Sequence, residues 1–433
     1  MPLSAMSHGS VARLAGHNRV RQGGEAISFM APQPLRVHDA PDGRAAHMMP
    51  KDRPEMNKPS ANTFNFQHTR QEGVFRTWFR GEHTNFNPDF EKMAEHDATL
   101  KWVTDGWQPA ARMVTPDTKI TAFGSCFAAN ISNWLAGRNY NILTKQQDSN
   151  AYVVKCGEGM VNSFVIRQQF EWAFEGKKFE EALWHGYEAE SYGYDESIRQ
   201  QTLDIFSQTD LFILTFGLSE VWYDEVTGGV FWRSIPQEAY DPARHKFRVT
   251  TVEENKDNIR AIYALIRKHR PDAKIITTLS PVPLIATFRP VSCISANSVS
   301  KAVLRVALDE LMRELGDEGY LHYWPSYEIV TDVFHSPFKQ DRRHLPKAVL
   351  DFIMMLFEQV WCEKQPTEEE MRRHWIAALS AAGLVSDRLE AAMSDEKLGA
   401  LKRILGKRKV ARHPEAEAAI RAQLEQLQAM VEK

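Results

Sequence analysis

The feature of this sequence that most constrains its fold is a set of short apolar runs that each end abruptly at a turn residue. The two clearest are residues 210–216, which stop at Gly217, and residues 274–279, which stop at Ser280. Apolar runs this short, without alternation, are typical of strands that are buried on both faces of a sheet. Further strand-like runs are expected at 119–123, 141–144 and 321–324.

Segments with helical periodicity separate these runs. Residues 126–135 place Phe127, Ile131 and Leu135 on one face at the spacing of a helix. Further helices are expected at 162–174, 253–269, 298–315 and 350–361. Strands that alternate with helices predict an α/β domain whose parallel sheet, of about five strands, is covered on both faces. The ligand site of such a sheet lies beyond the carboxyl ends of its strands.

The regions on either side of this domain, which is expected over 119–362, have a different character. Residues 1–60 are rich in Gly, Pro, Ser, His and Arg, and we expect them to be disordered. Residues 61–118 carry scattered aromatic side chains without a period, which predicts an irregular segment wrapped over the domain surface. The charged residues 366–433 predict a helical extension that packs on the domain or mediates self-association.

Composition restricts the class of function. A formal net charge of −3 argues against nucleic acid or an anionic membrane surface as a partner. The chain has no apolar run of about 18 residues, and its N-terminal residues lack the apolar core of a signal peptide. Its 4 cysteines are widely separated and lack zinc-site spacing. We therefore expect a cytoplasmic protein that binds no metal and needs no cofactor.

The turn after residues 119–123 carries the leading candidate for chemistry. Gly124 permits a sharp turn, and Ser125 then falls at a helix N-terminus, where free N–H groups and the helix dipole can stabilise an oxyanion. Serine is also a favoured N-cap residue, so the turn alone leaves a structural role open. Cys126 is an alternative nucleophile, because a helix N-terminus lowers a thiol pKa. We expect its side chain to point away from that of Ser125, toward the core.

A serine nucleophile needs a base, and Asp341 with His344 can supply one. These two residues are three positions apart, directly before the last predicted helix. The carboxylate can accept a hydrogen bond from one imidazole nitrogen and leave the other to take the serine proton. Most Asp and His residues at this spacing are surface pairs, and the position at the end of the domain is what favours a catalytic role.

Two further turns offer donors to an oxyanion. One follows residues 210–216 and contains Gly217, Ser219 and Glu220; the other contains Gly157 and Asn162. A glycine N–H and an asparagine amide are common donor types. Glu220 could also bind a substrate hydroxyl or form a structural hydrogen bond to a neighbouring loop.

Aromatic residues close to the central-strand turn permit two interpretations. They could form a stacking platform for a sugar ring, or they could pack in the core and anchor loops, which is the more common role. They are Trp222, Tyr223, Phe231 and Trp232. Arg289 could hold an anionic group or form an ordinary ion pair.

Four short strings together resemble the GSCFA-domain family, a relative of the SGNH or GDSL-type hydrolases. They are GSCFA at 124–128, TFGLSEVW at 215–222, TLSPVP at 278–283 and DRRHL at 341–345. The resemblance covers about residues 119–360. It implies a three-layer, flavodoxin-like fold and a triad of Ser125, His344 and Asp341.

The resemblance to the SGNH pattern is incomplete in the turn after the central strand. Where that pattern has Asn and Asp, this chain has Ser219 and Glu220. The oxyanion donor would then have to be Ser219, Asn162 or a backbone N–H.

Three classes of function fit these residues. The first, which we expect, is a serine esterase or acyl hydrolase acting on an O-acylated small molecule or carbohydrate. The second is an O-acyltransferase that uses the same site and passes the acyl group to a hydroxyl of a polysaccharide or another acceptor. The third is a non-catalytic binding or assembly protein; the altered turn favours it, whereas the joint presence of Ser125, Asp341 and His344 disfavours it.

Overall fold

A computed structural model describes residues 85–384 except 86, 96, 146–148, 179–182, 186–189 and 233–234. It also describes a few residues further on, namely 417, 418, 420–422, 424 and 425. The expectation of disorder for residues 1–60 therefore lies outside the described residues.

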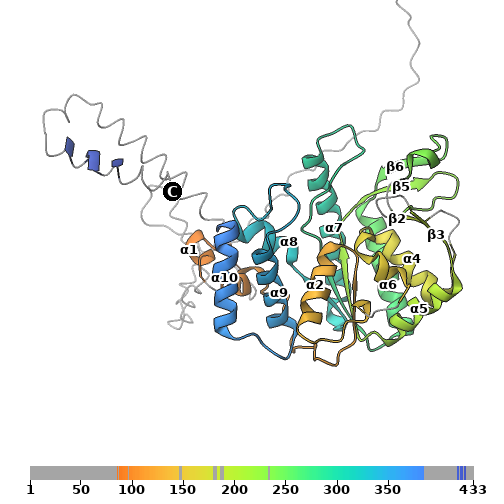
Figure 1. Cartoon of the computed structure of the whole chain (residues 1–433), viewed down its shortest axis with the longest axis horizontal. Coiled ribbons are helices and arrows are strands. Elements are labelled where there is room, and N and C mark those ends of the chain that lie inside the picture. Colours follow the sequence, from red (N-terminus) through yellow and green to blue (C-terminus); the bar gives the residue numbers. More distant parts are fainter. Residues whose placement is uncertain are drawn as a thin grey trace, which may run out of the picture. The chain divides into compact units, whose positions relative to one another are not determined.

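The centre of the described region is a parallel sheet that lies between two sets of helices (Figure 1). The order of its strands is β1-β4-β7-β8. Its strands are β1 Ile120–Phe123, β4 Leu211–Phe216, β7 Lys274–Leu279 and β8 Leu321–Trp324. Every residue of β4 is buried, as its unbroken apolar run predicts. The register pairs Phe123 with Leu214 and Phe216 with Leu279, so the carboxyl ends of these strands meet at one edge.

The prediction of a strand at 141–144 is wrong. Ile142 forms a single parallel bridge to Ile120, and the chain then enters a 3-10 turn over Leu143–Lys145. Leu143 and Thr144 are buried within this turn, and a short apolar run satisfies that geometry as well as it satisfies a strand. In the part of the chain that the structure describes, the sheet thus has four strands rather than about five.

Alternate residues of the strands belong to two separate apolar clusters, which lie on opposite faces of the sheet. Leu211 and Ile213 belong to the first cluster, whereas Phe212 and Leu214 belong to the second. Helices of the first cluster are α2 Cys126–Gly137, α9 Lys347–Trp361 and α10 Glu368–Ala382. Helices of the second are α3 Tyr152–Lys155, α4 Ser163–Glu175, α5 Glu196–Gln208, α6 Val252–His269 and α7 Cys293–Leu315. Both faces of the sheet are therefore covered by helices, as the alternation of elements predicts.

Two antiparallel pairs of strands stand apart from the main sheet, and the apolar periodicity did not indicate them. They are β2 Leu183–His185 with β3 Glu190–Tyr192, and β5 Glu220–Asp224 with β6 His245–Val249. β5 begins only three residues after Gly217, and its first residue, Glu220, pairs with Val249. The second pair therefore extends directly from the turn that follows the central strand.

Parts of the segments that flank the domain pack on it, namely residues around Trp107 before β1 and α10 after α9. Before β1 lie α1 Phe90–Met93 and a π-helical turn, Thr99–Val103. Trp107 contacts Tyr323 edge to face, with 5.1 Å between ring centroids. After α9, Trp375 of α10 packs against Phe352 at 5.0 Å. Among the described residues, no helix combines the length and apolar character needed to cross a membrane.

Candidate active site

The turn between β1 and α2 places Ser125 at the start of the helix. Gly124 has φ +119°, and a Cβ at this position would lie 2.2 Å from the carbonyl oxygen of Thr215. Only glycine fits so close to the neighbouring strand. Ser125 is the N-cap of α2, and its Oγ accepts a hydrogen bond from the N–H of Phe127 at 3.1 Å. Ser125 is only 3% exposed, so its hydroxyl lies at the helix N-terminus but is largely covered.

Asp341 and His344 form the pair that their spacing predicts. Nδ1 of His344 lies 2.5 Å from Oδ2 of Asp341, and both side chains are exposed. Oδ1 of Asp341 accepts from the backbone N–H groups of Arg343 and His344, each at 3.0 Å. The bond to His344, together with these backbone bonds, holds the pKa of Asp341 well below its usual range. Asp341 is therefore ionised and orients the imidazole; within the described residues Nε2 of His344 has no hydrogen bond.

The structure brings this pair to the same edge of the sheet as Ser125 without joining the two. No hydrogen bond connects Ser125 with His344 in the described part of the chain. Arg343, however, donates through Nε to the carbonyl oxygen of Pro283, which follows β7, at 3.2 Å. Its positive charge also acts to lower the pKa of Cys126, so the loop lies within electrostatic reach of the start of α2.

Cys126 is poorly suited to be the nucleophile. Its side chain is partly buried, and this burial raises the pKa of the thiol above its ordinary value. The opposing effect of Arg343 does not reverse that shift. The thiol therefore stays protonated at neutral pH, and the expectation that a helix N-terminus activates it is not met.

The two turns predicted to supply oxyanion donors lie side by side. The carbonyl oxygen of Val161 accepts from the N–H groups of Gly217, at 2.8 Å, and Leu218, at 3.1 Å. The N–H of Gly124 donates to the carbonyl oxygen of Gly157 at 3.0 Å, which connects the same segment to the Ser125 turn. Gly157 and Gly217 are therefore both part of the carboxyl edge.

Asn162 is the N-cap of α4, and its amide orientation is determined by its neighbours. The N–H of Val165 donates to its Oδ1 at 3.0 Å, so the atom that faces this donor must be the oxygen. The Nδ2 group of Asn162 makes no hydrogen bond among the described residues and remains a donor without an acceptor.

Ser219 is buried inside the protein. Its N–H donates to Oγ of Ser300 at 2.9 Å, and its carbonyl oxygen accepts from the N–H of Thr250 at 2.7 Å. Its own Oγ has no partner among the described residues. Ser219 is thus packed between the segments that carry Ser300 and Thr250.

Glu220 holds a loop. Its carboxylate accepts from Oγ1 of Thr287, at 2.8 and 3.1 Å, and lies 3.9 Å from the guanidinium of Arg289. Both partners belong to the segment between β7 and α7. Glu220 thus makes the structural hydrogen bond to a neighbouring loop that was one of its two expected roles. Arg289 likewise forms an ion pair, which was one of its two expected roles.

Trp222, Phe231 and Trp232, near the central-strand turn, pack in the core or anchor a loop. Phe231 and Trp232 are buried, and Nε1 of Trp232 donates to Oε1 of Gln168 at 3.0 Å. Trp222 packs against Phe247 and Phe288, with centroid distances of 5.4 and 5.1 Å. Phe288 lies in the same loop as Thr287, so this packing anchors the loop that Glu220 also holds.

A buried lysine is the site residue that the sequence reasoning missed. Lys301 of α7 is 2% exposed, and its Nζ donates to three carbonyl oxygens. These belong to Gly217 at 3.0 Å, Ser280 at 2.8 Å and Val282 at 2.8 Å. Its helical spacing from the buried Leu304 is the signal that could have identified it, because that spacing places a charge on the apolar face of α7.

A cavity of about 380 Å³ lies at the opposite edge of the sheet and does not belong to this site. Its lining includes Asp117, Asp210, Leu211 and Lys274, which lie at or just before the amino ends of the strands. Ligand sites of parallel sheets lie at the other edge, where Ser125 and His344 are found.

The fold and the clustered turns define the class of protein: an α/β protein whose chemical groups gather at the carboxyl edge of a parallel sheet. The chain belongs to the GSCFA family, whose family model matches residues 119–357, more than half of the sequence. Comparison with curated proteins gave no match. The family resemblance drawn from the four strings is thereby confirmed, and the matched range contains Ser125, Lys301, Asp341 and His344.

Proposed function

We propose that this protein is a serine esterase that removes an acyl group from a hydroxylated small molecule or carbohydrate. The observation that carries the proposal is the bond between His344 and the ionised Asp341, at the same edge of the sheet as the helix-capping Ser125. This pair leaves Nε2 of the imidazole without a partner among the described residues. A nucleophile, an oriented base and nearby N–H donors are the parts that acyl transfer requires.

In the proposed reaction, Oγ of Ser125 attacks the acyl carbonyl carbon while its proton passes to Nε2 of His344. The tetrahedral intermediate collapses when the imidazolium returns this proton to the leaving alcohol, and an acyl-enzyme remains. Water then attacks the acyl carbon, and His344 takes the proton of that water before giving it back to Ser125. Asp341 stays ionised throughout and stabilises the imidazolium.

The oxyanion of the intermediate needs preorganised donors. The backbone N–H groups of Ser125 and Gly157 make no hydrogen bond in the described part of the chain, and neither does Nδ2 of Asn162. We assign the oxyanion hole to these three groups rather than to Ser219. Hydrogen bonds to a developing charge are worth more in a covered site than in water, and Ser125 is covered.

The relation to SGNH hydrolases and to a flavodoxin-like, three-layer fold belongs to the same proposal. The bridge between Ile142 and Ile120 stands beside β1, where a fifth parallel strand would pair. With this bridge counted as a reduced strand, the sheet order becomes 2-1-3-4-5, the order of flavodoxin-like sheets. Helices on both faces of the sheet also support the relation.

The test is reaction of the full-length protein with a fluorophosphonate probe, with the label located by peptide mass spectrometry. Label is expected on Ser125 and is expected to be absent from Ser125→Ala. In His344→Ala the labelling rate should fall on the order of 10²- to 10⁴-fold, the usual contribution of a general base. His335→Ala is the matched control, because the backbone N–H of His335 pairs with Gly383 after α10 and not with the proposed site, and the variant should label like the wild type.

A folded wild-type protein that takes no label, or a label that persists in Ser125→Ala, would contradict the proposal. The assembly or binding alternative would then be preferred. With label established, acetylated sugars and other short-chain acyl esters are the next substrates to test.

The second candidate is an O-acyltransferase on the same site, and the low exposure of Ser125 favours it. A hydroxyl acceptor competes with water for the acyl-enzyme, so a covered nucleophile suits transfer. The two functions are distinguished by supplying an acyl donor with and without an added oligosaccharide. Release of free acid alone indicates hydrolysis, whereas acylation of the oligosaccharide at the expense of free acid indicates transfer.

A further inference from the structure

Lys301 is a buried cation whose hydrogen-bond partners carry no formal charge. Each of its three N–H donors is used, and each acceptor is a backbone carbonyl oxygen: those of Gly217, Ser280 and Val282. Removing an ammonium group from water costs several kcal/mol unless an opposite charge compensates it. A methionine would fill this space at a much lower cost, so packing alone does not account for the lysine.

The three carbonyl oxygens belong to two different turns of the candidate active site. Gly217 follows β4, whereas Ser280 and Val282 follow β7. The N–H of Ser280 also donates to the carbonyl oxygen of Phe216 at 2.8 Å, so the turns are adjacent where Lys301 joins them.

Each of these turns leads to a residue of the proposed machinery. The N–H of Gly217 donates to the carbonyl oxygen of Val161, the residue before Asn162. Pro283, the residue after Val282, accepts from Arg343, which immediately precedes His344. Lys301 therefore lies between the segment of the proposed oxyanion donor and the loop of the proposed base.

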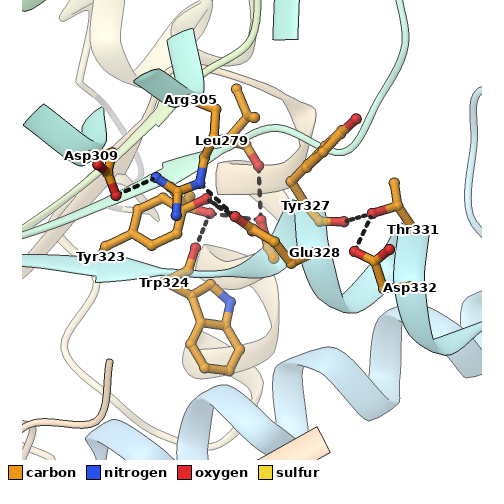
Figure 2. Close-up of polar contacts among 11 residues, drawn as sticks. Leu279, Arg305, Asp309, Tyr323, Trp324, Tyr327, Glu328, Thr331 and Asp332 are labelled. Atoms are coloured by element: carbon orange, nitrogen blue, oxygen red, sulfur yellow. Dashed lines mark hydrogen bonds and ion pairs between the residues drawn. The ribbon is translucent and has the colours of Figure 1, made fainter. Parts of the chain in front are cut away.

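A separate polar network holds α7 in the position from which Lys301 reaches these turns (Figure 2). Arg305, one helical turn after Lys301, donates through Nε to Oε1 of Glu328 at 2.6 Å, and its guanidinium lies 4.5 Å from the ring centroid of Tyr323. The hydroxyl of Tyr323 donates to the same carboxylate at 2.9 Å. These contacts attach α7 to β8 and to α8 Ser326–Glu328.

We propose that Lys301 is a positioning residue of the candidate active site, whose ammonium group ties the turn after β4 to the turn after β7. The tie holds the Asn162 segment and the His344 loop in one arrangement relative to Ser125. The inference rests on the proposed function, because it assigns Lys301 to the same reaction. Lys301 has no hydrogen bond to Ser125 or His344 in the described part of the chain and acts through the backbone.

The strength of the tie depends on the protonation of Lys301. Its pKa is lowered to about 7, mainly by burial; Cys126 opposes this shift and the charge of Arg343 adds to it. A neutral amine has only two N–H groups, so one of the three carbonyl oxygens loses its donor when the proton leaves.

Other charges on neighbouring elements are matched by their own partners. Lys256 of α6 pairs with Glu310 and Glu314 of α7, and Glu328 of α8 pairs with Arg305. Of the two lysines, Lys301 has its pKa lowered toward neutral pH, whereas the pKa of Lys256 is raised by its carboxylate partners.

The test compares Lys301→Met with Lys256→Met in the full-length protein. The control also removes a lysine that contacts α7, but its partners are carboxylates away from the site. Hydrogen exchange of the Gly217, Leu218 and Ser280 amides should accelerate about tenfold or more in Lys301→Met, because hydrogen bonds to a charged donor are lost. The rate of fluorophosphonate labelling should fall on the order of 10- to 100-fold, as expected for misplaced groups. Neither change is expected in the control.

The pH profile separates positioning from a general structural role. The wild-type labelling rate should have a limb that declines as the pH rises through about 7, and Lys301→Met should lack this limb. Lys301→Gln has a shorter side chain with an uncharged N–H donor and should give an exchange rate between those of the wild type and Lys301→Met. If Lys301→Met does not fold, Lys301→Gln replaces it in the test. Wild-type exchange and labelling rates in either variant, or the same declining limb in both proteins, would overturn the proposal.

The exchange measurement keeps this inference distinct from the proposed function. A wild-type protein without label would contradict the esterase proposal, whereas faster exchange in Lys301→Met would still establish the tie between the turns. Efficient labelling of the wild type together with normal exchange in Lys301→Met would support the esterase proposal and contradict the role of Lys301.

Discussion

Two buried charges in this protein have opposite surroundings. Glu358 of α9 is fully buried, and Arg138 lies 2.7 Å from its carboxylate while Trp134 donates to it at 3.3 Å. Lys301 of α7 is as deeply buried, but its partners are backbone carbonyl oxygens. Glu358 is compensated and joins α2 to α9, as a structural ion pair does. Lys301 is not compensated by a partner of opposite charge, and it lies where the strands end.

The comparison indicates how a buried charge can be assigned a role. When an opposite charge lies beside a buried charge, their attraction offsets much of the desolvation cost. Removing one of the two leaves the other buried without compensation. Neutral dipoles around a buried charge offset less of the desolvation cost, so the presence of such a charge needs a further explanation. At Lys301 we find that reason in the two turns that its ammonium group joins.

The largest expected effect on stability is that of Glu358→Ala. The substitution leaves the guanidinium of Arg138 and the indole N–H of Trp134 without their acceptor, and we expect a loss of about 3 kcal/mol in the free energy of unfolding. Urea unfolding measures the change. Glu368→Gln, in the exposed first turn of α10, is the control and should lose almost nothing.

The same variant should leave the labelling of Ser125 unchanged once the protein is folded. A labelling rate that falls in Glu358→Ala as it does in Lys301→Met would remove the distinction between the two buried charges.

An intermediate effect is expected in the pH dependence of stability that Lys301 causes. Its pKa in the folded protein, about 7, lies below the ordinary value of 10.5 for lysine, so between these values the unfolded chain binds more protons. Stability must then rise with pH in this window, because the cost of burying the charge is relieved. Relative to Lys301→Met, the wild type should gain on the order of 1 kcal/mol per pH unit.

Urea unfolding of both proteins at several pH values between 7 and 10 measures this difference. Lys256→Met serves again as the reference, because the pKa of Lys256 is raised by Glu310 and Glu314 rather than lowered. A difference between wild type and Lys301→Met that does not change with pH would show that Lys301 keeps an ordinary pKa in the folded protein.

The smallest effect on stability is expected for Asp341→Asn, which removes an exposed charge instead of a buried one. Since solvent screens exposed pairs, the midpoint of urea unfolding should not move. The labelling rate of Ser125 should nevertheless fall, because the imidazole of His344 loses the carboxylate that orients it. A shifted midpoint with an unchanged labelling rate would reassign this pair to a structural role.

Much of the fold could be predicted from local patterns. The runs at 211–216 and 274–279 are strands because unbroken apolar segments bounded by turn residues have few other ways to be buried. The prediction of a strand at 141–144 failed because an apolar run of four residues fits a buried turn as well as a strand. The pair β5–β6 escaped detection because its strands mix charged and aromatic residues and depend on each other for pairing.

In the candidate site, too, the features that depend on residues close in sequence were predictable, and those that depend on distant residues were not. Gly124 and Ser125, like Asp341 and His344, are close in sequence, so their local geometry follows from the chain itself. The burial of Ser219 depends on Ser300 and Thr250, which are distant along the chain, and its spacing from Gly217 could not reveal it.

The sequence by itself determined the α/β class, the glycine–serine turn at the end of β1 and the Asp341–His344 pair, since these depend on periodicity and short-range spacing. Only the tertiary structure decided that Lys301 is buried and that its ammonium group meets Gly217, Ser280 and Val282. From sequence alone a lysine is expected at the surface, because lysines are seldom fully buried. The difference is physical: hydrogen bonds within a turn are encoded locally, whereas the environment of a buried charge is made by segments that meet only when the chain has folded.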